Sequence, residues 1–212
     1  MLKLNVTTRA AKRIIPVLAV LWLLASCSQP EPPQLAGGTL LPSTRTLKPF
    51  TLVDHHKQPF TQDSLSGQWS FVFFGYTHCP DICPTALGKL KHVQTLLKVA
   101  DRKAPPAQVV FISLDPARDT PTVLARYVSA FDPGFVGVTG KDAQLKHLTS
   151  QLGVHYERSP GGSDGDYQLT HSAAVFLFNP QGRYQALFSA PQDPEKIARD
   201  FTAIRHWYAA SR

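Results

Sequence analysis

Residues 70–84 read SFVFFGYTHCPDICP, and this stretch decides the fold class. Its first seven residues form a nearly continuous apolar run, which is typical of a strand buried on both faces of a sheet. Apolar residues recur at helical spacing over residues 80–99, so we predict a helix directly after this strand. A buried strand that leads into a helix is typical of α/β proteins.

The same alternation of strands and helices continues outward from this stretch. The sequence predicts strands over residues 50–54 and 108–114, helices from Thr120-Pro121 onward and over 142–152, a hairpin of 173–178 with 184–188, and an amphipathic last helix. This order of elements predicts an α/β sandwich with a mixed sheet, in a single domain over residues 50–212.

The composition is that of a globular protein. Of the 212 residues, 43% are hydrophobic and 17% are charged, which excludes intrinsic disorder and collagen-like repeats. The net charge of +7 comes from 22 basic and 15 acidic residues. Four of the basic residues lie within residues 1–26, and without them 18 basic residues face 15 acidic ones. So small an excess gives no reason to expect a nucleic-acid partner.

The first 26 residues have the three parts of a secretory signal. A basic segment ends at Lys12-Arg13, an apolar run covers residues 14–24, and Leu-Ala-Ser-Cys ends at Cys27. This ending resembles the bacterial lipobox, which implies cleavage before Cys27, a lipid on its sulfur and a flexible proline-rich tether over residues 27–49. We therefore expect an exported, membrane-anchored lipoprotein that faces the periplasm or the cell exterior. The alternatives are a soluble secreted protein and an uncleaved anchor.

Three chemically capable residues meet at one edge of the predicted sheet. Cys79 and Asp115 each follow the end of a buried strand, and ligands bind beyond the carboxyl ends of parallel strands in open α/β sheets. If strand 173–178 is antiparallel to those two, then His171, just before it, lies at the same edge. Asp115 has a second interpretation, because Asp-Pro pairs often cap turns.

Cys79 and Cys83 are the two cysteines that remain once Cys27 is assigned to lipid. A bridge between them would close too small a loop to add much stability, so they favour a chemical role. They open the predicted helix, where the dipole favours a thiolate and residues four apart share a face. With His171 they would form a set of two sulfurs and one nitrogen, which suits copper or zinc. The spacing alone is a weak signal, and two buried small residues are the alternative.

Three sequence blocks together resemble the Sco/SenC family. They are GYTHCPDICP (75–84), SLDPARDTP (113–121) and DYQLTHS (166–172), within a similarity over about residues 50–208. The resemblance implies a thioredoxin-like, membrane-tethered protein that delivers copper to the Cu-A centre of cytochrome c oxidase. It also implies Cys79, Cys83 and His171 as the copper ligands, with Asp115 as an acidic residue near the site.

Two classes of function remain open from the sequence. The first is a copper metallochaperone, a carrier without turnover, whose partners are the Cu-A subunit of the oxidase and other copper carriers. The second is a thiol:disulfide oxidoreductase, in which Cys79 and Cys83 reduce the acceptor's cysteines and are themselves reduced by thiol reductants. A peroxidase of the peroxiredoxin kind fits less well. Its active site has one more residue between the threonine and the attacking cysteine than separates Thr77 from Cys79. Zinc is the alternative metal.

Overall fold

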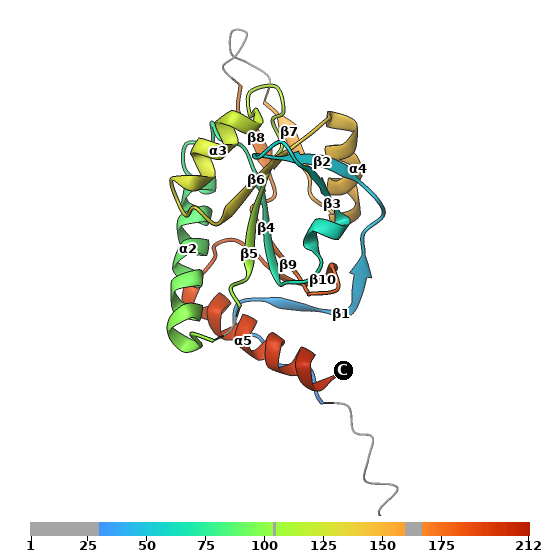
Figure 1. The fold of residues 1–212 in the computed structure, drawn as a ribbon, viewed down its shortest axis with the longest axis vertical. Helices are drawn as coiled ribbons and strands as arrows, with labels where there is room; N and C mark the ends of the chain where they lie inside the picture. The colour runs from blue at the N-terminus through green and yellow to red at the C-terminus, as the bar shows by residue number, and fades with distance from the viewer. Residues whose placement is uncertain (1–29, 104, 160–166) are drawn as a thin grey trace, which may run out of the picture. The chain divides into compact units, whose positions relative to one another are not determined.

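A computed structural model of the protein describes residues 30–103, 105–159 and 167–212 (Figure 1). The predicted signal segment and Cys27 lie outside these residues. The chain divides into a large unit, residues 34–203, and a small unit in which residues 204–212 accompany the segment that ends at Pro33. In the small unit, Trp207 Nε1 donates a hydrogen bond to the Pro30 carbonyl oxygen at 2.9 Å. Over the described ranges, no helix is both long and apolar enough to cross a membrane.

The predicted strands and helices occur in the predicted order. The structure adds a short 3-10 helix and five strands that the sequence did not predict: Thr39–Thr46, Pro59–Thr61, Phe135–Thr139, Tyr156–Arg158 and Leu169–His171. The strands are β1 (Thr39–Thr46), β2 (Thr51–Asp54), β3 (Pro59–Thr61), β4 (Ser70–Gly75), β5 (Gln108–Ser113), β6 (Phe135–Thr139), β7 (Tyr156–Arg158), β8 (Leu169–His171), β9 (Val175–Phe178) and β10 (Arg183–Phe188). The helices are the short 3-10 helix η1 (Gln62–Leu65), α2 (Ile82–Ala100), α3 (Pro121–Ser129), α4 (Asp142–Leu152) and α5 (Pro194–Ala210).

Eight strands form one mixed sheet, in the order β1-β10-β9-β4-β5-β6-β2-β3. The strands β4, β5 and β6 are parallel, and β9 is antiparallel to β4. This antiparallel direction was the condition for His171 to lie at the edge where β4 and β5 end, and it is confirmed. The fold is the mixed α/β arrangement that the sequence predicts.

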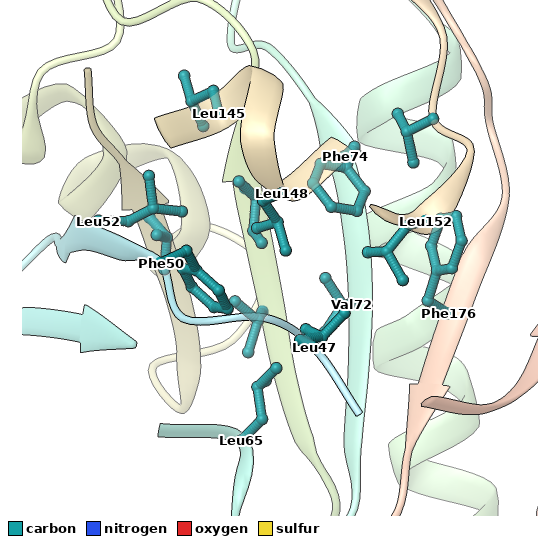
Figure 2. Close-up of a cluster of buried hydrophobic side chains, with 14 of the residues drawn as sticks. Leu47, Phe50, Leu52, Leu65, Val72, Phe74, Leu145, Leu148, Leu152 and Phe176 are labelled. Atoms are coloured by element: carbon teal, nitrogen blue, oxygen red, sulfur yellow. The ribbon is translucent and has the colours of Figure 1, made fainter. Parts of the chain in front are cut away.

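The side chains of β4 alternate between two layers of core. Phe71 and Phe73 point to one face, where Phe71 packs 5.1 Å from the ring of Phe201 in α5. The other face carries Val72 and Phe74, which join a cluster with apolar residues of α4 (Figure 2). Figure 1 shows α2 and α4 on opposite sides of the strands. Because both faces are covered, β4 is apolar almost throughout, as its sequence indicates.

The prediction that residues 27–49 form a flexible tether is wrong for the C-terminal part of this range. Thr39–Thr46 form β1, which pairs with β10 at the edge of the sheet. The pairing register shifts between Leu40 and Arg45, a stretch that contains Pro42. An edge strand with an irregular register tolerates a residue that has no N–H to donate, so the prolines did not prevent this segment from joining the sheet.

Candidate metal centre

The two cysteines lie on either side of the start of α2. This helix begins at Ile82, so Cys83 lies in its first turn, whereas Cys79 lies in the turn that follows β4. The helix was predicted over residues 80–99, so its observed start is two residues later. Cys79 precedes Pro80, and a residue before proline is disfavoured in the helical conformation. The start of the helix still stabilises negative charge on Cys79, since the Cys83 N–H donates to the Cys79 sulfur at 3.4 Å.

His171 reaches the same place from a separate part of the chain. It ends β8, which pairs with β7 in a small two-stranded sheet that the sequence did not predict. Its Nε2 atom lies 3.3 Å from the Cys83 sulfur. One ligand atom from each of Cys79, Cys83 and His171 lies within 4.8 Å of the other two. Over the described ranges, these three form the one group of three or more potential metal ligands.

Hydrogen bonding and burial prepare His171 to coordinate a metal. Its Nδ1 faces the Ser172 carbonyl oxygen at 3.1 Å, and because a carbonyl only accepts, Nδ1 carries the proton. Nε2 therefore presents its lone pair toward the cysteines. Burial lowers the pKa of His171 below its usual range and so favours the neutral ring that a metal needs.

Cys83 is fully buried, and this burial raises the pKa of its thiol far above the usual range. Cys79 is partly exposed, and both cysteines are free thiols. A metal that binds here must displace the Cys83 proton and supplies the positive charge that stabilises the buried thiolate.

The spacing of the three ligand atoms fits a metal ion. Bonds of about 2.2 Å in a three-coordinate site place the ligand atoms about 3.8 Å apart, by simple trigonal geometry. The observed separations, 3.3 Å for one pair and at most 4.8 Å for the others, need only small adjustments. Two thiolates and one imidazole suit copper or zinc and exclude calcium and magnesium, which prefer oxygen ligands.

Asp119 fixes the turn that carries Cys79, a role the sequence analysis missed. Its carboxylate is fully buried and accepts hydrogen bonds from Thr77 N–H at 2.9 Å, the Thr77 hydroxyl at 2.5 Å and the Ser113 hydroxyl at 2.6 Å. The sequence suggested a helix start at residues 119–121, and Thr120 is the residue whose side chain caps α3. Because Thr120 caps the helix, the Asp119 carboxylate can bind both Thr77, which follows β4, and Ser113, the last residue of β5.

Asp115 does not belong to the three-residue group. Its carboxylate accepts hydrogen bonds from Arg118 Nε and, at 2.5 Å, from the Tyr167 hydroxyl. Its backbone oxygen also accepts from the Asp119 N–H at 2.9 Å, which closes the turn after β5. Asp115 therefore holds the turn after β5 and orients Arg118 and Tyr167. His78 stays outside the group, with Nδ1 3.2 Å from the Thr77 hydroxyl.

Comparison with known proteins gives a family match over most of the chain. The family model described as SCO1/SenC matches residues 39–206. A mouse protein, "Protein SCO2 homolog, mitochondrial", is 40% identical over 161 residues, which are 76% of this chain and 62% of the relative. A "SCO2-like protein" of Rickettsia felis is 37% identical over 183 residues, 85% of this chain and 87% of the relative. The chain thus spans about three fifths of the length of the mouse protein.

A solved structure of Arabidopsis thaliana ScoI with copper bound is also similar. Its TM-score is 0.70 at 31% identity, and the match covers 76% of this chain and 99% of that one. The match confirms the thioredoxin-like fold that the sequence resemblance implied.

Proposed function

Because the chain belongs to the SCO1/SenC family, we propose that it is a copper metallochaperone that holds copper with Cys79, Cys83 and His171. The observation that carries this proposal is the convergence of these three ligand atoms within 4.8 Å from two distant segments of the chain. The copper in the similar Arabidopsis structure supports the choice of metal. The soft thiolates favour Cu(I), and the imidazole extends the site to Cu(II).

The proposed acceptor is the Cu-A subunit of cytochrome c oxidase. Copper leaves by ligand exchange, in which a thiolate of the acceptor bonds to the metal and one sulfur of this protein is released. Cys79 is the ligand released first, because it is partly exposed whereas Cys83 is fully buried. Transfer therefore starts at the open side of the site.

The transfer reaction can be tested with a reduced, metal-free Cu-A domain. We expect a mixture of the Cu(I)-loaded and Cu(II)-loaded protein to produce the mixed-valence Cu-A absorption spectrum, and the Cys79→Ser variant to produce none. If the wild-type protein retains its copper in the presence of this acceptor, the chaperone function is contradicted.

The same two sulfurs support a second candidate function, a thiol:disulfide oxidoreductase. The more exposed Cys79 would attack a disulfide of the acceptor, and Cys83 would then resolve the mixed disulfide, leaving a Cys79–Cys83 bridge and two acceptor thiols. Thiol release from an oxidised, copper-free acceptor measures this activity separately. His171→Ala should weaken copper retention and leave this thiol exchange in place.

We further propose that the protein is exported and anchored in a membrane by lipid on Cys27. The basic and apolar segments before Cys27 and the lipobox-like Leu-Ala-Ser-Cys support this proposal. Metabolic labelling with a fatty acid tests it, because Cys27→Ser removes the acylated sulfur. Labelling that persists in this variant would contradict lipidation at Cys27.

A further inference from the structure

Tyr76 contacts both the turn that carries Cys79 and the segment that carries His171. It is 2% exposed and connects the end of β4 to the turn of Cys79. Its carbonyl oxygen accepts a hydrogen bond from the Cys79 N–H at 3.3 Å. The backbone of Tyr76 therefore helps to close the turn that carries Cys79.

The side chain of Tyr76 extends to the segment of the third ligand. Its ring meets the His171 ring edge to face, with 6.1 Å between the centroids and 87° between the planes. Its hydroxyl donates a hydrogen bond of 2.6 Å to Oε1 of Gln168, the residue directly before β8. Because His171 is the last residue of β8, Tyr76 holds this short strand at both of its ends.

We propose that Tyr76 is a positioning residue, whose hydroxyl holds β8 so that His171 Nε2 stays within bonding distance of a copper ion on the two cysteines. The strand β8 has only three residues and pairs with the equally short β7, and so small a sheet is marginally stable alone. The bond from Tyr76 to Gln168 connects this sheet to the end of β4. The inference rests on the proposed function, because it takes His171 as a copper ligand.

Two single variants test this role. Tyr76→Phe removes the hydroxyl and keeps the ring, whereas Gln168→Leu removes the acceptor at an exposed position where folding is not at risk. We expect each variant to lower Cu(II) affinity about five- to tenfold, which corresponds to the net free energy of one hydrogen bond. The double variant should lose no more Cu(II) affinity than either single variant, because both substitutions remove the same hydrogen bond. Tyr184→Phe, at a buried tyrosine in β10, is the matched control and should bind copper like the wild type.

Electron paramagnetic resonance of the Cu(II) form separates positioning from general stability. We expect the nitrogen hyperfine splitting of the wild type to weaken in Tyr76→Phe and in Gln168→Leu, and to persist in Tyr184→Phe. Unchanged affinity and splitting in Gln168→Leu would overturn the inference and leave the proposed function intact. A wild-type spectrum without nitrogen coupling would contradict His171 as a ligand and so overturn both. If Tyr76→Phe does not fold, the Gln168→Leu result decides alone.

Discussion

At the scale of single residues, protonation of Cys83 controls how tightly the site binds copper. Burial raises the pKa of the Cys83 thiol, so at neutral pH the metal-free protein holds this proton and releases it on binding. Burial lowers the pKa of His171, so its ring is neutral at this pH and releases no proton when copper binds. Copper affinity should therefore rise with pH, by about tenfold per pH unit for each proton released.

Competition with a copper chelator between about pH 6 and 8 measures this dependence. Cys83→Ser, which removes the titrating thiol, should bind more weakly and with a shallower slope. Equal affinity of the wild type at both ends of the range would contradict Cys83 as a thiolate ligand.

Gly75 makes room for the Cys83 sulfur. A Cβ atom at this position would lie 2.7 Å from that sulfur and 2.8 Å from the Phe111 ring, closer than such contacts allow. Gly75→Ala should displace the sulfur, lower copper affinity at least about tenfold and destabilise the fold by about 1–3 kcal/mol. Copper competition and thermal unfolding measure the two effects.

Gly88→Ala is the control for Gly75→Ala, because a Cβ at Gly88 meets no atom within 4 Å. Gly88 lies in the interior of α2, where alanine is favoured over glycine. The Gly88→Ala protein should therefore be more stable by about 0.5–1 kcal/mol, with copper binding unchanged. If Gly75→Ala bound copper like Gly88→Ala, the close contact between β4 and the sulfur would have no role in the site.

At the scale of elements, α5 holds the segment before β1 through one carboxylate. Asp200 is 2% exposed and accepts hydrogen bonds of 2.7–3.1 Å from the N–H groups of Ala36, Gly37 and Gly38. Asp200→Ala leaves these three donors without their acceptor and should cost about 2–4 kcal/mol of unfolding free energy. Urea unfolding measures this loss, with the exposed Glu195→Ala in the same helix as the control.

The copper site itself should be unaffected by Asp200→Ala, because none of its ligands contacts this carboxylate in the described structure. A folded Asp200→Ala protein should therefore give the copper absorption spectrum of the wild type. A changed spectrum would show that the site depends on this distant attachment.

The elements that sequence alone predicted are those with strong periodicity or buried apolar runs. The strands β4 and β5 and the helices α2 and α4 were predicted to within about two residues at each end. β1 was missed because Pro42, together with the prolines before and after the strand, resembles a linker, and β8 because three residues give too short a pattern. The three ligands could be predicted because the end of β4 and the start of its antiparallel neighbour β9 place them at one edge. Asp119 was missed because its partner Thr77 lies 42 residues away and no local pattern connects them.

At the scale of the whole molecule, oxidation and copper binding compete for the same two sulfurs. A bridge between Cys79 and Cys83 leaves no thiolate to bind a metal, and His171 alone is a weak site. The oxidised protein should therefore lose nearly all copper affinity and regain it on reduction. Titration of copper into the disulfide form, followed by addition of a thiol reductant, measures both steps. Tight stoichiometric binding to the disulfide form would place the metal at other residues.

X-ray absorption of the reduced, copper-loaded protein tests the ligand set most directly. We expect one copper per chain with two sulfur ligands at about 2.2–2.3 Å and one nitrogen ligand at about 2.0 Å. His171→Ala should lose the nitrogen contribution and keep the two sulfurs. A copper ion surrounded by nitrogen and oxygen alone, or a spectrum that stays the same when both Cys79 and Cys83 are replaced by serine, would contradict the site.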